Sequence, residues 1–73
     1  MDEKTRIEKD IVMFQENITK LEKMKLSEKQ KSVVQLAKQY YEDSKYYLLK
    51  EDNFTAFGCI NYAHGLLDGI IKF

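Results

Sequence analysis

The chain has 73 residues, with 12 lysines and arginines against 12 aspartates and glutamates, one histidine, one cysteine and no proline. A net charge of zero excludes the strong positive field that attracts nucleic acids or anionic membranes, and a lone cysteine excludes an internal disulfide. The length fits a single domain over residues 1–73, whose small core buries only about 60% of the unfolded surface.

A first helix is predicted over about residues 3–25. Ile7, Ile11, Phe14, Ile18 and Leu21 recur at intervals of 4, 3, 4 and 3 residues. This spacing places them on one face of a helix, as a stripe close to a heptad pattern. Such a stripe can pack within its own bundle or against a second copy, and the pattern leaves both open.

A second helix is predicted over about residues 28–50. Ser27 and Gln30 have the spacing of a capping box, in which each side chain bonds a free backbone N–H of the other residue. Tyr46 and Leu49 project onto the polar side of this helix, where an exposed aromatic beside an exposed leucine indicates a contact site. Single exposed apolar residues are also common without a function. Its apolar side is predicted to hold Val33, Ala37, Tyr40, Tyr41, Ser44, Tyr47 and Leu48.

A third helix is predicted over about residues 53–72, with Asp52 or Asn53 as its N-cap. The two breaks between the helices are short, so neighbouring helices must run antiparallel. We therefore predict an all-α fold, an up-down-up three-helix bundle. The apolar face of the third helix is centred on Ala63, with Ala56, Cys59, Ile60, Leu66, Leu67 and Ile70 around it.

Three glycines of the third helix, Gly58, Gly65 and Gly69, project opposite Ala63 and beside Tyr62. Each glycine inside a helix costs about 0.5–1 kcal/mol relative to alanine. Either the glycines form a flat groove where another helix or a ligand approaches the backbone, or the helix is a weakly constrained surface element. Together with Tyr46 and Leu49, these four residues are the candidate interaction surface.

Asn61, His64 and Asp68 lie at the edge of the same apolar face and form a candidate polar site. A carboxylate can orient an imidazole, as in general-base or metal sites. The chain has no second histidine and no pairing of a nucleophile with a base. We therefore favour a boundary histidine that contacts Asp68 within the helix, and we expect no enzymatic activity, no metal and no cofactor.

Residues 37–69 resemble an archaeal family of small helical proteins known as domain of unknown function 357, with an AxxYYxD…YFL…YAxGLLD pattern. Ser44 stands where the family pattern has alanine, and residues 1–26 add no resemblance. The resemblance implies a helical bundle and an archaeal source, and it implies no activity. The matching residues are Ala37, Tyr40, Tyr41, Asp43, Tyr47, Leu48, Asp52, Ala56, Tyr62, Ala63, Gly65, Leu66, Leu67 and Asp68.

A looser similarity is to the helical hairpins of HEPN domains, whose nuclease members need an arginine four to six residues before a histidine. The only arginine here, Arg6, lies in another predicted helix. We therefore expect no nuclease of this kind. A non-catalytic HEPN-like or tetratricopeptide-like hairpin remains open, which would bind a small molecule or nucleotide at Asn61, His64 and Asp68.

Location and partners follow from the same composition. No apolar run approaches the roughly 20 residues of a membrane span, the charged start has no secretory signal, and an unpaired cysteine is typical of a reducing cytoplasm. We predict a cytoplasmic interaction module without a membrane, bound to another protein or to itself, with a dimer favoured. We do not expect nucleic-acid binding, because the lysines near the first break fit a solvated turn: Lys20, Lys23, Lys25, Lys29 and Lys31.

Overall fold

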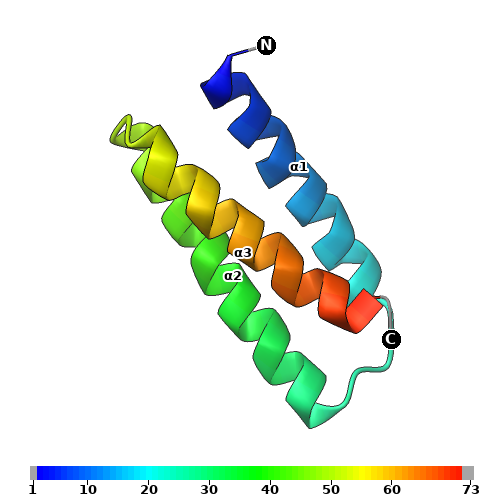
Figure 1. The fold of residues 1–73 in the computed structure, drawn as a ribbon. Helices are drawn as coiled ribbons and strands as arrows, with labels where there is room; N and C mark the ends of the chain where they lie inside the picture. Colours follow the sequence, from blue (N-terminus) through cyan, green and yellow to red (C-terminus); the bar gives the residue numbers. More distant parts are fainter. Residues whose placement is uncertain (1, 72–73) are drawn as a thin grey trace.

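The computed structural model describes residues 2–71, which form three helices and no strand (Figure 1). Helix α1 spans Glu3–Glu22, α2 spans Glu28–Leu49 and α3 spans Asn53–Ile71. α2 and α3 lie side by side and antiparallel, while α1 runs in the same direction as α3 (Figure 1). The predicted all-α, up-down-up three-helix bundle is confirmed.

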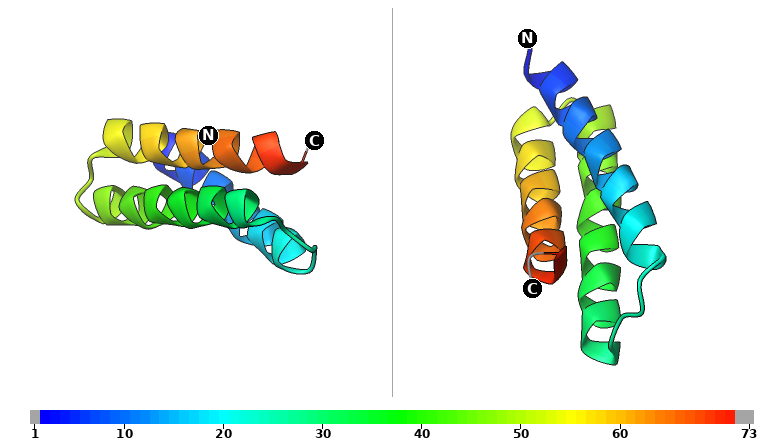
Figure 2. Two further views of the ribbon diagram at one scale, coloured as in Figure 1. Left: turned by 90° about the horizontal axis from the view of Figure 1, so that it is seen from below. Right: turned by 90° about the vertical axis from the view of Figure 1, so that its right-hand side faces the viewer.

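Helix α1 is inclined to the pair formed by α2 and α3 (Figure 2). It contacts α3 more extensively than it contacts α2. The seam between α1 and α2 is therefore the loosest of the three, and several shallow surface hollows lie along it.

The core lies between the three helices and contains all five residues of the predicted α1 stripe. On α2 the prediction needs one correction, since Val34 is buried and Val33 lies at the core margin. Val34 shares a face with Ala37, Tyr41 and Ser44. α2 is rotated so that this face meets both other helices, which leaves the other predicted residues partly buried: Val33, Tyr40, Tyr47 and Leu48.

The first helix is shorter than predicted, ending at Glu22 instead of residue 25. The N–H of Lys23 donates to the carbonyls of Lys20 and Leu21, which closes the last turn. Residues 23–27 then reverse the direction of the chain, and Leu26 packs against the core. The predicted capping box begins α2, with Gln30 N donating to Ser27 Oγ at 3.1 Å and Ser27 N to Gln30 Oε1 at 2.8 Å.

The turn between α2 and α3 is tight and held by backbone hydrogen bonds. Asp52 N donates to Tyr47 O at 2.9 Å and Glu51 N to Leu48 O at 3.1 Å, the two bonds of a Schellman motif. Glu51 has a φ of 62°, in the left-handed region where glycine is usual. Asp52, one of the two predicted caps, accepts from Thr55 N at 3.2 Å and so begins α3.

Candidate interaction surfaces

The solvent-facing side of α3 carries almost no charge. Among the 19 residues of this helix, Asp68 is the only aspartate, glutamate, lysine or arginine, although the whole chain has 12 residues of each sign. Phe54 is 85% exposed and Tyr62 is 52% exposed. We call this surface the α3 face, and it consists of Phe54, Gly58, Asn61, Tyr62, Gly65, Asp68 and Gly69.

The glycines of the α3 face are not required by the fold of the single chain. A Cβ atom added at Gly58, Gly65 or Gly69 would have no neighbouring atom within 4 Å. None of the three has a positive φ, so the backbone does not demand glycine either. All three are exposed, as the helical projection predicts, and they leave a stretch of bare backbone facing solvent.

Two of these glycines border a hollow on the seam between α2 and α3. Gly65 and Gly69 line it together with Lys29, Val33 and Leu66. Its volume is about 380 Å³. The hollow forms because Gly65 and Gly69 have no side chains to fill this part of the seam.

Tyr62 forms a fixed aromatic border of the α3 face. Its ring packs edge-on against Tyr40 of α2, with 4.6 Å between the ring centroids and 70° between the planes. Such a pair contributes about 0.5–1.5 kcal/mol beyond the burial of area. Tyr62 is therefore held in place by the bundle while about half of it stays available to a partner.

The structure does not bring Tyr46 and Leu49 to the α3 face. Tyr46 packs edge-on against Tyr47, with the Nζ atom of Lys50 at 5.6 Å from its ring centroid. Leu49 is 85% exposed and lines a different hollow, between α1 and α2, with Val12. The candidate surface predicted from the sequence thus divides into separate regions.

Phe54 is the member of the α3 face that the sequence interpretation missed. It lies one helical turn before Gly58 and projects to the same side of α3. The helical projection that groups the three glycines would have found it.

His64 is tied to another helix and not to Asp68. It is half-buried, and its Nε2 atom lies 2.7 Å from the backbone carbonyl oxygen of Asp10 on α1. Because a carbonyl oxygen can only accept, Nε2 donates this bond. The ring also packs edge-on against Phe14, with 5.8 Å between centroids. His64 therefore joins α1 to α3, and among residues 2–71 no hydrogen bond links it to Asp68.

Asn61 and Asp68 are exposed on α3, and neither lines the hollows described above. Binding of a small molecule or nucleotide at Asn61, His64 and Asp68 thus stays a prediction. Nuclear magnetic resonance titration with nucleotides would test it through shifts centred on these three residues.

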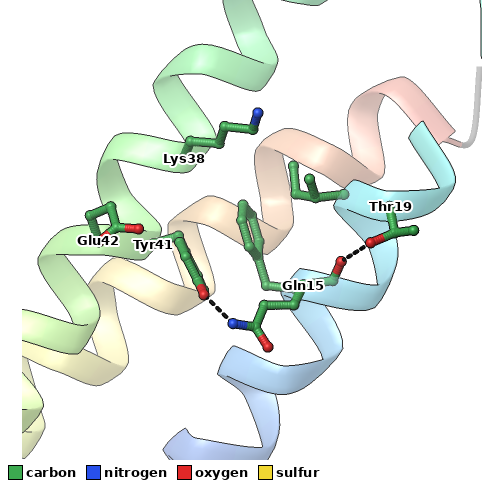
Figure 3. Close-up of a pocket in the computed structure, with 7 residues that line it drawn as sticks. Gln15, Thr19, Lys38, Tyr41 and Glu42 are labelled. Carbon is green, nitrogen blue, oxygen red and sulfur yellow. Dashed lines mark hydrogen bonds between the residues drawn. The ribbon is translucent and has the colours of Figure 1, made fainter. Parts of the chain in front are cut away.

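The seam between α1 and α2 is held by aromatic and polar contacts (Figure 3). Phe14 stacks on Tyr41 with 4.8 Å between centroids, and the side-chain amide of Gln15 donates to the Tyr41 hydroxyl. Thr19 Oγ1 donates to the Gln15 carbonyl at 3.0 Å. These groups line a hollow of about 330 Å³. The polar groups of Gln15, Thr19 and Tyr41 bond one another, which suits a structural seam better than a ligand site.

Cys59 lies at the core margin and is only partly buried, whereas the sequence predicted a buried core residue. Burial and, to a lesser extent, the nearby carboxylates of Asp43 and Asp52 raise the pKa of its thiol above the ordinary value of 9.0. A thiol that keeps its proton is a weak nucleophile and a weak metal ligand. Within the described residues, no three His, Cys, Asp or Glu side chains gather closely enough to hold a metal ion.

These features define a small all-α protein, a three-helix bundle in which one helix turns a face with a single charged residue to solvent. The chain belongs to the family described as Protein of unknown function (DUF357), whose model matches residues 9–73. The match is longer than the resemblance over residues 37–69 and includes most of α1. A comparison with curated proteins gives no match. Over residues 2–71, no helix combines the length and apolarity needed to cross a membrane.

Proposed function

We propose that this protein is a non-catalytic interaction module that binds another protein chain through the α3 face. One observation carries the proposal: an exposed, nearly uncharged helix surface holds three glycines that no contact within the chain requires. Each of them lowers the stability of the helix by about 0.5–1 kcal/mol. A close contact with a partner's backbone would offset that loss, and within residues 2–71 no neighbouring atom lies within 4 Å of a Cβ added at these positions.

The composition of the α3 face suits a protein partner. The cores of protein interfaces are depleted of charged residues and enriched in aromatic ones, and binding energy is concentrated in such anchors. Phe54 and Tyr62 are exposed aromatics at the two sides of the glycines. Bare helix backbone also lets a second helix approach more closely than large side chains allow.

The two side chains best suited to catalysis, His64 and Cys59, have surroundings that favour a binding role over an enzymatic one. The Nε2 atom of His64 is already bonded to the Asp10 carbonyl, and burial raises the pKa of the Cys59 thiol. We also propose a cytoplasmic location, where the unpaired cysteine stays reduced.

Site-specific photo-cross-linking in the native cells tests this function. p-Benzoylphenylalanine in place of Phe54 keeps an aromatic ring on the α3 face. The same residue in place of Tyr46, an aromatic that is 55% exposed outside this face, is the matched control. We expect protein adducts from position 54 and few from position 46. No adduct at 54 above the control would contradict the proposal, and adducts at 46 alone would move the contact to the end of α2.

A further inference from the structure

We infer that the partner of the α3 face is a second copy of this chain, with the two α3 helices antiparallel and Phe54 of each copy seated on Gly65 and Gly69 of the other. This inference rests on the proposed function and names its partner. It follows from shape, charge and symmetry of the described residues.

The positions of large and small residues along α3 are self-complementary. In a symmetric antiparallel pair, a residue before the two-fold axis lies opposite the residue equally far beyond it. With the axis between Asn61 and Tyr62, Gly58 lies opposite Gly65 and Phe54 lies opposite Gly69. The two helices then meet backbone to backbone at Gly58 and Gly65, at an interaxial distance near the lower limit of about 8 Å.

Phe54 and the hollow at the other end of α3 match in this arrangement. Phe54 is a large apolar side chain without cover in the single chain. The hollow beside Gly65 and Gly69 has apolar walls from Val33 and Leu66. Symmetry forms the contact twice, so each copy both inserts a ring and receives one.

The charges at the two ends of α3 are complementary in the same arrangement. Glu51 and Asp52 directly precede α3, while Lys29 lines the hollow beside Gly69. Antiparallel pairing brings the two carboxylates of one copy toward Lys29 of the other, and opposite charges across an interface favour the correct partner and register.

The one charge of the α3 face also fits this orientation. Asp68 lies opposite Thr55 of the second copy when the helices are antiparallel. A parallel pair would instead place Asp68 against Asp68 and Phe54 against Phe54, leaving the hollows unfilled. The shape of the face therefore selects the antiparallel orientation, which also keeps the two Asp68 carboxylates apart.

The dimer should be weak. α3 has 19 residues and is about 28 Å long, so one helix from each copy buries an area at the low end for protein interfaces, below about 1,200 Å². Small interfaces of this kind are typical of transient association. We expect a dissociation constant in the micromolar range and a monomer at high dilution.

Sedimentation equilibrium of the full chain from about 1 μM to about 1 mM tests the pairing. We expect a monomer–dimer equilibrium that Gly65→Leu and Phe54→Ala each weaken by about tenfold or more. A Cβ atom at position 65 meets no neighbouring atom within 4 Å, so Gly65→Leu adds no clash at the helix surface and should keep the helical circular dichroism of the wild type. Leu49→Ala is the matched control, because Leu49 is as exposed as Phe54 and lies outside the α3 face.

A charge-reversal pair tests the register. Lys29→Glu should weaken the dimer, and the double variant Lys29→Glu/Glu51→Lys should restore part of the lost affinity. A dimer that tolerates both Gly65→Leu and Phe54→Ala would overturn the pairing, as would a charge-reversal double variant without recovery.

The outcomes separate this inference from the proposed function. A monomer at every concentration, with cross-links from position 54 to other proteins, would overturn the dimer and leave the interaction function standing. A monomer without any adduct at position 54 would overturn both.

Discussion

Replacing the two central glycines of α3 by alanine should stabilise the monomer. Gly58 and Gly65 lie inside the helix, and a Cβ atom at either position meets nothing within 4 Å. The substitution therefore adds no clash and removes the conformational freedom that glycine has in the unfolded chain. Both changes should act in the same direction.

The size of the gain follows from helix propensity and from the separation of the two sites. Each glycine-to-alanine change in a helix interior is worth about 0.5–1 kcal/mol. The two positions are two helical turns apart, about 10 Å along the axis, and share no contact, so their effects should add. We expect Gly58→Ala/Gly65→Ala to raise the free energy of unfolding by about 1–2 kcal/mol. In a domain of this size, each kcal/mol raises the melting temperature by about 4–8 °C.

Urea unfolding followed by circular dichroism measures this gain. The protein is diluted until the unfolding midpoint no longer depends on concentration, so that self-association does not contribute. Gln39→Ala, an exposed change on α2, is the control and should alter stability far less. An unchanged or lowered free energy of unfolding in the double variant would refute the argument, because the glycines would then serve the monomer itself.

Three further predictions concern single side chains. Glu51→Gly should stabilise the fold by about 1 kcal/mol in urea unfolding, because it relieves the left-handed backbone at φ 62°, whereas Glu51→Ala should give no such gain. His64→Ala should cost about 1–3 kcal/mol by loss of the bond to α1 and the aromatic contact, and an equal cost for the exposed Asn61→Ala would contradict this. Burial and two nearby aspartates raise the pKa of Cys59. Its reaction with a disulfide reagent at pH 8 should thus be slower than that of a free cysteine. A thiol as reactive as free cysteine would refute the raised pKa. The contribution of Cys59 to the free energy of unfolding should be complete below the ordinary thiol pKa of 9.0 and decline above it.

Local sequence signals predicted the elements of this fold correctly. The regular spacing from Ile7 to Leu21 identified a helix and its buried face, since helix period and burial act along one short segment. Ser27 and Asp52 marked the starts of α2 and α3, because capping is a contact between residues three apart. The resemblance over residues 37–69 pointed to the right family, and the family model extends it to residues 9–73.

Errors arose where two faces of one helix compete for the core. Val33 and Val34 are equally apolar, and only the positions of the other two helices decide that Val34 is buried. Cys59 was expected in the core and lies at its margin for the same reason. Helical periodicity defines which residues share a face, but the rotation of that face depends on packing against neighbours far away in the sequence.

The sequence by itself determined three amphipathic helices, their antiparallel order and the outward position of the α3 glycines, because each depends on local spacing and short connections. Tertiary structure alone decided that His64 bonds Asp10, that Leu49 and Tyr46 lie away from the glycines, and that a Cβ atom on any of the three glycines would meet nothing within 4 Å. These features depend on how whole helices approach one another. Their contacts join residues of different helices, often far apart in sequence, and no local pattern specifies such contacts.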